Sequence, residues 1–276
     1  MAPVALVFAA LVTAQAPALN KPLADREVAV PSQYSDIRIR DEGPFRSMYF
    51  ARPDGSMALE SRVHKKQPSQ LVVPYTKAMF ASHLYAPKPK RALLVGLGGG
   101  SMVHFVRVFD PNLLVTAVDI DPAVVQSAAK YFGVTPSENI EIVTADAFDV
   151  LAKKSPKFDI IWMDAFLQPS EDTDENGVPL NIKTLAFWRQ VKKRLTKQGV
   201  LVVNVNTGPS TKRDLATMKE AFGALFSVAP RGSGNLIVMA PIQTPDAKTL
   251  AARAKKLDAR ASQIGFADLA RRAKAL

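Results

Sequence analysis

The spacing of apolar residues changes along the chain and predicts a small β-sheet followed by a larger α/β unit. Residues 35–50 alternate apolar and polar side chains, and Asp54-Gly55 is a hairpin turn signal, so we expect a small antiparallel β-domain over residues 34–62. Helical spacing over residues 70–84 then predicts a bridging helix, to which we assign residues 63–90. Over residues 91–240, apolar runs of strand length alternate with helical patterns, which predicts a doubly wound, Rossmann-like α/β fold with a mainly parallel sheet.

The two ends of the chain carry patterns of their own. Residues 3–12 form an apolar run followed by Ala14-Gln15-Ala16, which has the length and cleavage pattern of a signal peptide and is too short to span a bilayer. We therefore expect residues 1–20 to direct export to the periplasm or the medium. The alternative is a cytoplasmic protein with an apolar leader, because no basic residue precedes Lys21. Residues 246–276 are basic and have helical spacing, which predicts one surface helix or a pair.

The most informative segment is residues 91–121, where a glycine-rich loop lies between two apolar runs. The first run ends at Gly96, which opens a loop containing Gly98 and Gly100, and the second run ends at Asp119. Strand, glycine loop, helix, strand and acid in this order form a nucleotide-binding half-unit. Glycines let the backbone turn tightly and approach a ligand, and the carboxylate of Asp119 can accept hydrogen bonds from both ribose hydroxyls.

Acids follow three successive predicted strands, at Asp119, Asp146 and Asp164. A carboxylate at Asp146 can bind the exocyclic amine of an adenine, and Ile120 or Phe148 can cover the ring. Three carboxylates at one edge of a sheet favour an adenosyl ligand that carries a sulfonium cation over a dinucleotide, because they would repel a pyrophosphate. The alternative is that the acids are only helix caps and turn residues that follow strands.

The order VGLGGG, VDID, ADAF and FDIIWMDAF resembles the spermidine synthase family, which is built on the class I S-adenosylmethionine methyltransferase fold. The likeness extends over residues 34–240. It implies a transferase that takes S-adenosylmethionine or decarboxylated S-adenosylmethionine as co-substrate, moves an aminopropyl group to a small-molecule amine, and uses no metal. It also implies Asp164 as the catalytic residue and a donor site formed by Gly96, Gly98, Gly100, Asp119, Ile120, Asp146 and Ala147.

Three positions depart from the family pattern on the side of the amine. Gly99 stands where aminopropyltransferases carry the acid of GGGDGG, Ala58 stands where they carry a glutamine, and the segment after Asp164 lacks their second acid. These departures argue against ordinary spermidine synthesis. They leave open an S-adenosylmethionine-dependent methyltransferase and a non-catalytic relative that binds a nucleoside or a polyamine. The likeness also places a gate at residues 170–177, whose acids suit a cationic substrate; the alternative is a solvated loop without a role.

Composition adds few constraints. The 276 residues are 47% hydrophobic and carry a net charge of +11. Much of the excess charge lies on helical faces without interleaved aromatic residues, so we expect solvated faces rather than nucleic-acid binding. The absence of cysteine excludes disulfides and thiolate chemistry, and the three histidines show no metal-ligand spacing. We expect no integral membrane span, and a homodimer is compatible with the sequence.

Overall fold

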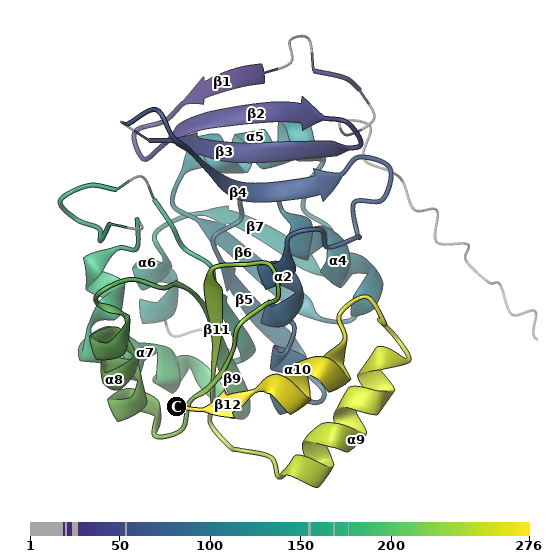
Figure 1. Ribbon diagram of the computed structural model, residues 1–276, viewed down its shortest axis with the longest axis vertical. Helices are drawn as coiled ribbons and strands as arrows, with labels where there is room; N and C mark the ends of the chain where they lie inside the picture. The colour runs from purple at the N-terminus through teal and green to yellow at the C-terminus, as the bar shows by residue number, and fades with distance from the viewer. Residues whose placement is uncertain are drawn as a thin grey trace, which may run out of the picture.

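Figure 1 shows two β-sheets, a small one formed by the N-terminal part of the chain and a larger one flanked by helices. The computed structural model describes residues 19, 21–23, 27–52, 54–153, 156–167, 169–175 and 177–276. The expected leader, residues 1–20, lies outside this part of the chain except for Leu19 and is therefore not described. None of the described helices is both long and apolar enough to cross a bilayer.

The small sheet contains four antiparallel strands in the order of the chain. They are β1 (Glu27–Pro31), β2 (Asp36–Glu42), β3 (Phe45–Ala51) and β4 (Met57–His64). Alternation along β2 buries Ile37 and Ile39, while the neighbouring Arg38 stays partly exposed. The sequence pattern does not predict β1, a short edge strand that ends at Pro31; the unpaired side of an edge strand tolerates a proline.

The bridging segment forms two short helices, whereas the spacing over residues 70–84 predicts one. They are α2 (Pro74–Met79) and α3 (Ser82–Tyr85). Proline is tolerated in the first turn of a helix but not in its interior, because it lacks an N–H and clashes with the preceding turn. Helix α2 therefore begins at Pro74. Phe80, which follows α2, is fully buried and packs against Phe105 and Trp162, so the bridge is fixed to the main domain.

The larger sheet confirms the doubly wound fold. Its strand order is β12-β10-β11-β9-β8-β5-β6-β7, in which the strands from β9 to β7 are parallel and the other three are antiparallel. The parallel strands are β5 (Arg91–Val95), β6 (Leu114–Asp119), β7 (Ile140–Thr144), β8 (Phe158–Met163) and β9 (Leu195–Asn206). The antiparallel strands are β10 (Phe226–Val228), β11 (Asn235–Pro241) and β12 (Lys274–Ala275).

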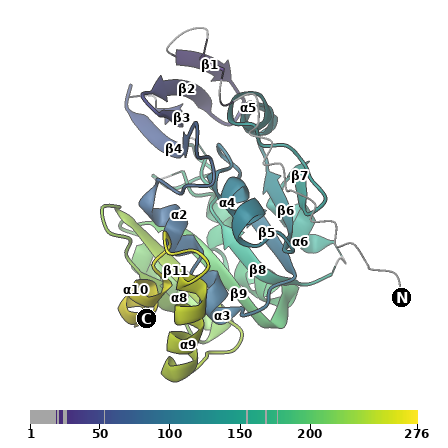
Figure 2. The ribbon, with the colours of Figure 1, turned by 90° about the vertical axis from the view of Figure 1, so that its right-hand side faces the viewer.

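Helices pack on both faces of this sheet (Figure 2). They include α4 (Ser101–Phe109), α5 (Pro122–Phe132), α6 (Ala147–Ala152), α7 (Leu185–Arg194) and α8 (Thr211–Phe222), with a 3-10 turn, η1 (Leu180–Lys183). Along β5, Ala92 and Leu94 belong to one apolar core with α4 and α5, whereas Leu93 and Val95 belong to another with α7 and α8. Because both faces of the strand are buried, its sequence is a continuous apolar run.

The C-terminal segment forms α9 (Ala247–Asp258), α10 (Phe266–Arg272) and the edge strand β12. Arg253 of α9 donates to the carbonyl oxygens of Leu84 (2.7 Å) and Tyr85 (3.2 Å), and Phe266 is fully buried. The tail therefore packs on the bridging segment. The sequence pattern does not predict β12, because two residues are too few to show an alternation.

Candidate active site

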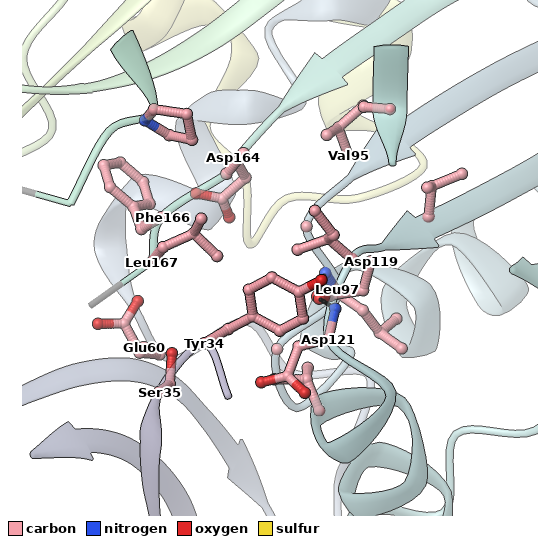
Figure 3. A pocket seen from close by; sticks show the side chains of 18 of the residues that line it. Tyr34, Ser35, Glu60, Val95, Leu97, Asp119, Asp121, Asp164, Phe166 and Leu167 are labelled. Atoms are coloured by element: carbon pink, nitrogen blue, oxygen red, sulfur yellow. Dashed lines mark hydrogen bonds between the residues drawn. The ribbon is translucent and has the colours of Figure 1, made fainter. Parts of the chain in front are cut away.

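A large pocket lies where the small sheet meets the carboxyl ends of β5, β6 and β8 (Figure 3). Its volume of about 790 Å³ is sufficient for a ligand the size of a nucleoside together with a small amine. Residues from both sheets line it, among them Ser35, Glu60, Asp119 and Asp164. In the view of Figure 3, the carboxyl groups of Asp164 and Glu60 lie to the left of the Tyr34 ring and that of Asp119 lies to the right.

The glycine loop forms the wall of the pocket between β5 and α4. Gly96 has a φ of +90° and lies so close to the end of β8 that a Cβ atom there would be 1.8 Å from the carbonyl oxygen of Asp164. Gly96 and Gly98 line the pocket, as predicted for close backbone approach. Gly100 has a different position: it precedes α4 with its α-carbon against Val134. The loop therefore holds the end of β8 as well as shaping the pocket.

Asp119 ends β6 and fixes the glycine loop. Its Oδ2 accepts a hydrogen bond from the backbone N–H of Leu97 (2.8 Å), and its Oδ1 accepts one from that of Asp121 (3.0 Å). Burial raises the pKa of Asp119 to about 6, and the bonds from the backbone oppose that rise. A carboxylate has about four acceptor positions, so Asp119 keeps capacity for ligand hydroxyls. Ile120, which follows it, also lines the pocket.

Asp146 and Ala147 follow β7 and lie in the same wall. Asp146 is the N-cap of α6, because its Oδ1 accepts a hydrogen bond from the backbone N–H of Phe148 (2.8 Å). Asp146 therefore both caps α6 and lines the pocket. The role predicted for it in adenine binding rests on that position.

Asp164 follows β8 and is held from two sides. Asn204 of β9 donates to its Oδ1 through Nδ2 (2.8 Å), and the hydroxyl of Tyr75 in α2 donates to its Oδ2 (3.1 Å). Burial raises the pKa of Asp164 to about 6, while the two hydrogen bonds act in the opposite direction. Its carboxylate is thus oriented, largely ionised at neutral pH and placed at the strand end where the sequence predicts a catalytic acid.

Tyr75 and Asn204 are site residues to which the sequence patterns assign no role. Tyr75 is the second residue of α2, which begins at Pro74, and its hydroxyl reaches Asp164 at the end of β8. Asn204 is fixed in turn by Asn235 of β11, whose Nδ2 donates to its Oδ1 (2.9 Å). The antiparallel pairing of β9 with β11 makes that contact, and no local sequence signal predicts it.

Glu60 enters the pocket through a β-bulge in β4. On one side of it Leu59 pairs with Tyr49, and on the other Ser61 pairs with Met48, so Glu60 has no opposite residue in β3. A bulge bends its strand and redirects the extra side chain. Burial and, to a smaller extent, the charge of Asp164 raise the pKa of Glu60 to about 8, and Arg52 acts against both. Figure 3 shows its carboxyl group below that of Asp164.

Gly99, the position at which the family resemblance implies an acid in aminopropyltransferases, has no room for a side chain. A Cβ atom there would lie 2.9 Å from the ring of Phe132 and 3.0 Å from Oγ of Ser61. Ser61 comes from the same bulge as Glu60. A side chain is therefore sterically excluded at Gly99 by the packing of α5 and of the small sheet against the glycine loop.

The acidic segment after β8 folds back over the pocket. The backbone N–H of Leu167 donates to the carbonyl of Gly177 (2.8 Å), and Asp172 and Thr173 line the pocket. The carboxylate of Asp174 is paired with Lys183, which also contacts Asp214 (2.7 Å). The acids of this segment therefore differ in role, because Asp172 faces the pocket while Asp174 forms an ion pair. Across the described part of the chain, no group of three or more histidines or acids is placed to hold a metal ion.

Comparison with known proteins agrees with this geometry. The model of the spermine/spermidine synthase domain matches residues 74–244. A polyamine aminopropyltransferase from Vibrio vulnificus is 30% identical over 264 residues, which cover 92% of this chain and 85% of that protein. Human methyltransferase-like protein 13, solved in complex with SAH, is 27% identical with a TM-score of 0.61, over 70% of this chain and 92% of that one.

Spermidine synthase from Thermotoga maritima shares the fold, with a TM-score of 0.55 and 18% identity over 84% of this chain and 80% of that one. The family model covers more than half of this chain, and the Vibrio relative aligns with nearly all of it. The chain therefore belongs to the spermine/spermidine synthase domain family, as its motif order predicts, and is a transferase of that family.

Proposed function

We propose that this transferase uses an S-adenosyl sulfonium donor and moves an aminopropyl group to a small-molecule amine. The observation that carries the proposal is the oriented, buried carboxylate of Asp164, which shares one pocket with the glycine loop and Asp119. Buried carboxylates suit a cationic donor, and the free acceptor capacity of Asp119 suits a ribose diol. The similarity to a polyamine aminopropyltransferase supports the choice of group transferred.

In this mechanism the adenosyl part of the donor lies against Asp119, Ile120, Asp146 and Ala147. Asp164 takes a proton from the ammonium group of the acceptor and passes it to water, which leaves a neutral amine. That nitrogen attacks the carbon next to the sulfonium in line, so a C–N bond forms while the C–S bond breaks and its electron pair stays on sulfur. Tyr75 and Asn204 hold Asp164 in the orientation that this proton transfer needs.

Methyl transfer is the second candidate, and the packing at Gly99 favours it. Without an acid there, the family's contact to the donor's aminopropyl amine is missing, and the similarity to a methyltransferase solved with SAH points the same way. Incubation with S-adenosylmethionine or its decarboxylated form, each with a panel of amines, separates the two. Release of methylthioadenosine supports aminopropyl transfer, and release of S-adenosylhomocysteine supports methyl transfer. If calorimetry detects binding of neither donor, both candidate functions are contradicted, and a non-catalytic relative is favoured.

Asp119→Ala is expected to weaken donor binding by about 1–3 kcal/mol, the usual cost of removing one partner of a charge-assisted hydrogen bond. Isothermal titration with the donor checks this. Asp149→Ala is the matched control, because Asp149 lies in the first turn of α6 outside the pocket lining. Equal donor affinity in the two variants would show that Asp119 does not contribute to donor binding.

Asn204→Ala is expected to move the pH dependence of turnover toward higher pH. The hydrogen bond from Asn204 lowers the pKa of Asp164, so its loss raises that pKa above about 6. A base acts only when deprotonated, so activity in the variant should appear at higher pH and approach the wild-type rate well above the new pKa. Asn206→Ala, two residues along β9, does not touch Asp164 and should leave the profile in place. An unchanged profile in Asn204→Ala would contradict its positioning role.

A further inference from the structure

The pairing of β9 with β11 brings three asparagine side chains together next to Asp164. Asn204 and Asn206 lie two residues apart on β9, and Asn235 of β11 pairs with Asn206. We propose that Asn235 is a positioning residue for the base: it fixes the amide of Asn204 so that the NH2 group, and not the oxygen, faces Asp164. This inference rests on the proposed function, because it concerns the base of that reaction.

The direction of the hydrogen bonds in this group follows from one backbone N–H. The N–H of Asn235 can only donate, and it donates to Oγ of Ser233 (3.2 Å). The hydroxyl of Ser233 in turn donates to Oδ1 of Asn235. Since Oδ1 is the acceptor of this amide, its Nδ2 is the atom left to face β9.

Nδ2 of Asn235 has two hydrogens and donates to two acceptors on β9. It donates to Oδ1 of Asn204 (2.9 Å) and to Oδ1 of Asn206 (2.6 Å). An amide has one oxygen and one NH2 group, so Asn204, whose oxygen is engaged, presents Nδ2 to Oδ1 of Asp164 (2.8 Å). The chain of hydrogen bonds therefore runs from the hairpin turn to the base and ends on a donor, which favours the carboxylate form of Asp164.

A reversed amide at Asn204 would have the opposite effect. Its oxygen would then face Oδ1 of Asp164, and two acceptors at this distance repel each other unless the carboxyl group carries a proton. Asn204 is 6% exposed, so water has little access to relieve that repulsion. The orientation of one amide thus decides whether Asp164 is ready to take a proton.

The groups that face Asp164 from other elements act on it independently of Asn235. The charge of Asp119 at the end of β6 raises the pKa of Asp164, and the hydroxyl of Tyr75 in α2 lowers it. Glu60 of β4 lies in the same pocket, and its own pKa is raised by the charge of Asp164. None of these three contacts passes through β11, so they remain when residue 235 is changed.

Charged groups also lie on the far side of Asn204, where they balance one another. Asn204 and Asn206 line a small cavity of about 50 Å³ together with Lys183. Lys183 is paired with Asp174 and contacts Asp214 (2.7 Å). Among the described residues, the effect from this side that shifts the pKa of the base is the hydrogen bond donated by Asn204.

Asn235→Asp tests the assignment, because aspartate has nearly the same shape and offers only acceptors when ionised. Asn204 should then turn its NH2 group toward the new carboxylate and its oxygen toward Asp164. We expect the midpoint of the pH profile of turnover to rise by about 1–2 units, the equivalent of a lost hydrogen bond to a charged group. Turnover at pH 6 should fall by about 5- to 50-fold, and well above the new midpoint it should return to the wild-type rate.

Asn206→Asp is the matched control. It introduces the same charge beside the same amide, but at a position that already accepts a hydrogen bond from Asn235, so the orientation of Asn204 is kept. Its midpoint should rise less than that of Asn235→Asp, because only the repulsion between carboxylates acts. Equal rises in the two variants would overturn the assignment. So would a rise in Asn235→Asp that persists in full when Asn204 is also replaced by alanine.

Ser233→Ala tests the start of the chain without adding a charge, in a partly exposed turn outside both apolar cores. Loss of the hydroxyl leaves Oδ1 of Asn235 without this donor, so the amide of Asn235 can reverse. The midpoint should then rise, by less than in Asn235→Asp. Ser233→Thr keeps the hydroxyl and should match the wild type. Equal midpoints in the two Ser233 variants would overturn the chain of hydrogen bonds on which the assignment depends.

A titration without substrate separates this inference from the proposed function. In protein labelled with ¹³C at the aspartate carboxyl groups, the signal of Asp164 is identified by its loss in Asp164→Asn. It should titrate at a pKa of about 6 in the wild type and at a higher pKa in Asn235→Asp. A raised pKa without turnover on any donor would contradict the proposed function and support the role of Asn235. An unchanged pKa would overturn that role and leave the proposed function standing.

Discussion

Replacing Asp164 with asparagine is expected to lower turnover by about 10²-fold or more, the usual contribution of a positioned acid or base. Asparagine keeps the shape of the side chain and can still accept a hydrogen bond from Tyr75 or Asn204, but it cannot take a proton. Donor affinity should change far less, because the adenosyl part is assigned to Asp119 and its neighbours. Single-turnover kinetics and donor titration on the same preparation measure the two effects separately.

Asp159→Asn is the control on the same strand. Asp159 accepts hydrogen bonds from the backbone of Lys90 and Arg91 and from Thr196 at the opposite end of β8. Its loss should reduce thermal stability without reducing turnover per folded molecule. Near-normal turnover in Asp164→Asn would show that Asp164 only caps the end of the strand. Loss of both folding and donor binding would show that its role is structural.

Gly96→Ala is expected to reduce the free energy of unfolding by roughly 2–5 kcal/mol, the sum of left-handed backbone strain and overpacking. The new Cβ atom would lie 1.8 Å from the carbonyl oxygen of Asp164, and neither backbone can move without disturbing the pocket. Donor affinity and turnover should therefore fall together in the folded fraction. Urea denaturation measures the stability, and donor titration measures the binding.

Gly223→Ala separates strain from collision. Gly223 has nearly the same φ, +89° against +90° for Gly96, but a Cβ atom there would meet nothing within 4 Å. Only the strain term should remain, about 1–2 kcal/mol, with donor binding unchanged. Equal losses of stability in the two variants would show that the close approach of Gly96 to the end of β8 adds nothing to the cost of the Gly96→Ala substitution.

The parts of the site that the sequence predicts are those that follow a strand directly. Asp119 and Asp164 end apolar runs, and the carboxyl ends of neighbouring parallel strands meet at one edge of the sheet, so their proximity follows from the topology. Gly96 and Gly98 are predicted for the same reason. The Rossmann-like fold follows from the alternation of strand-length and helical patterns.

The amine side could not be predicted in this way, because it depends on contacts between distant segments. The bulge at Glu60 is a property of the pairing between β3 and β4, and a run of alternating residues gives no sign of it. Tyr75 depends on where α2 begins and Asn204 on the pairing with β11. The ion pair of Asp174 with Lys183 likewise joins a loop to a 3-10 turn and cannot be read from composition.

The placement of Glu60 on the small sheet has a consequence for how this architecture diversifies. The residues assigned to the donor all belong to the larger sheet and its loops, whereas Glu60 lines the same pocket from a hairpin outside that sheet. Substitution of Glu60 would change this wall of the pocket directly, whereas an insertion in β4 would also shift Ser61, which packs against Gly98 and Gly99 of the glycine loop. Exchange of residues 54–64 would therefore change the wall that this hairpin contributes to the pocket and, through Ser61, the packing of the glycine loop as well.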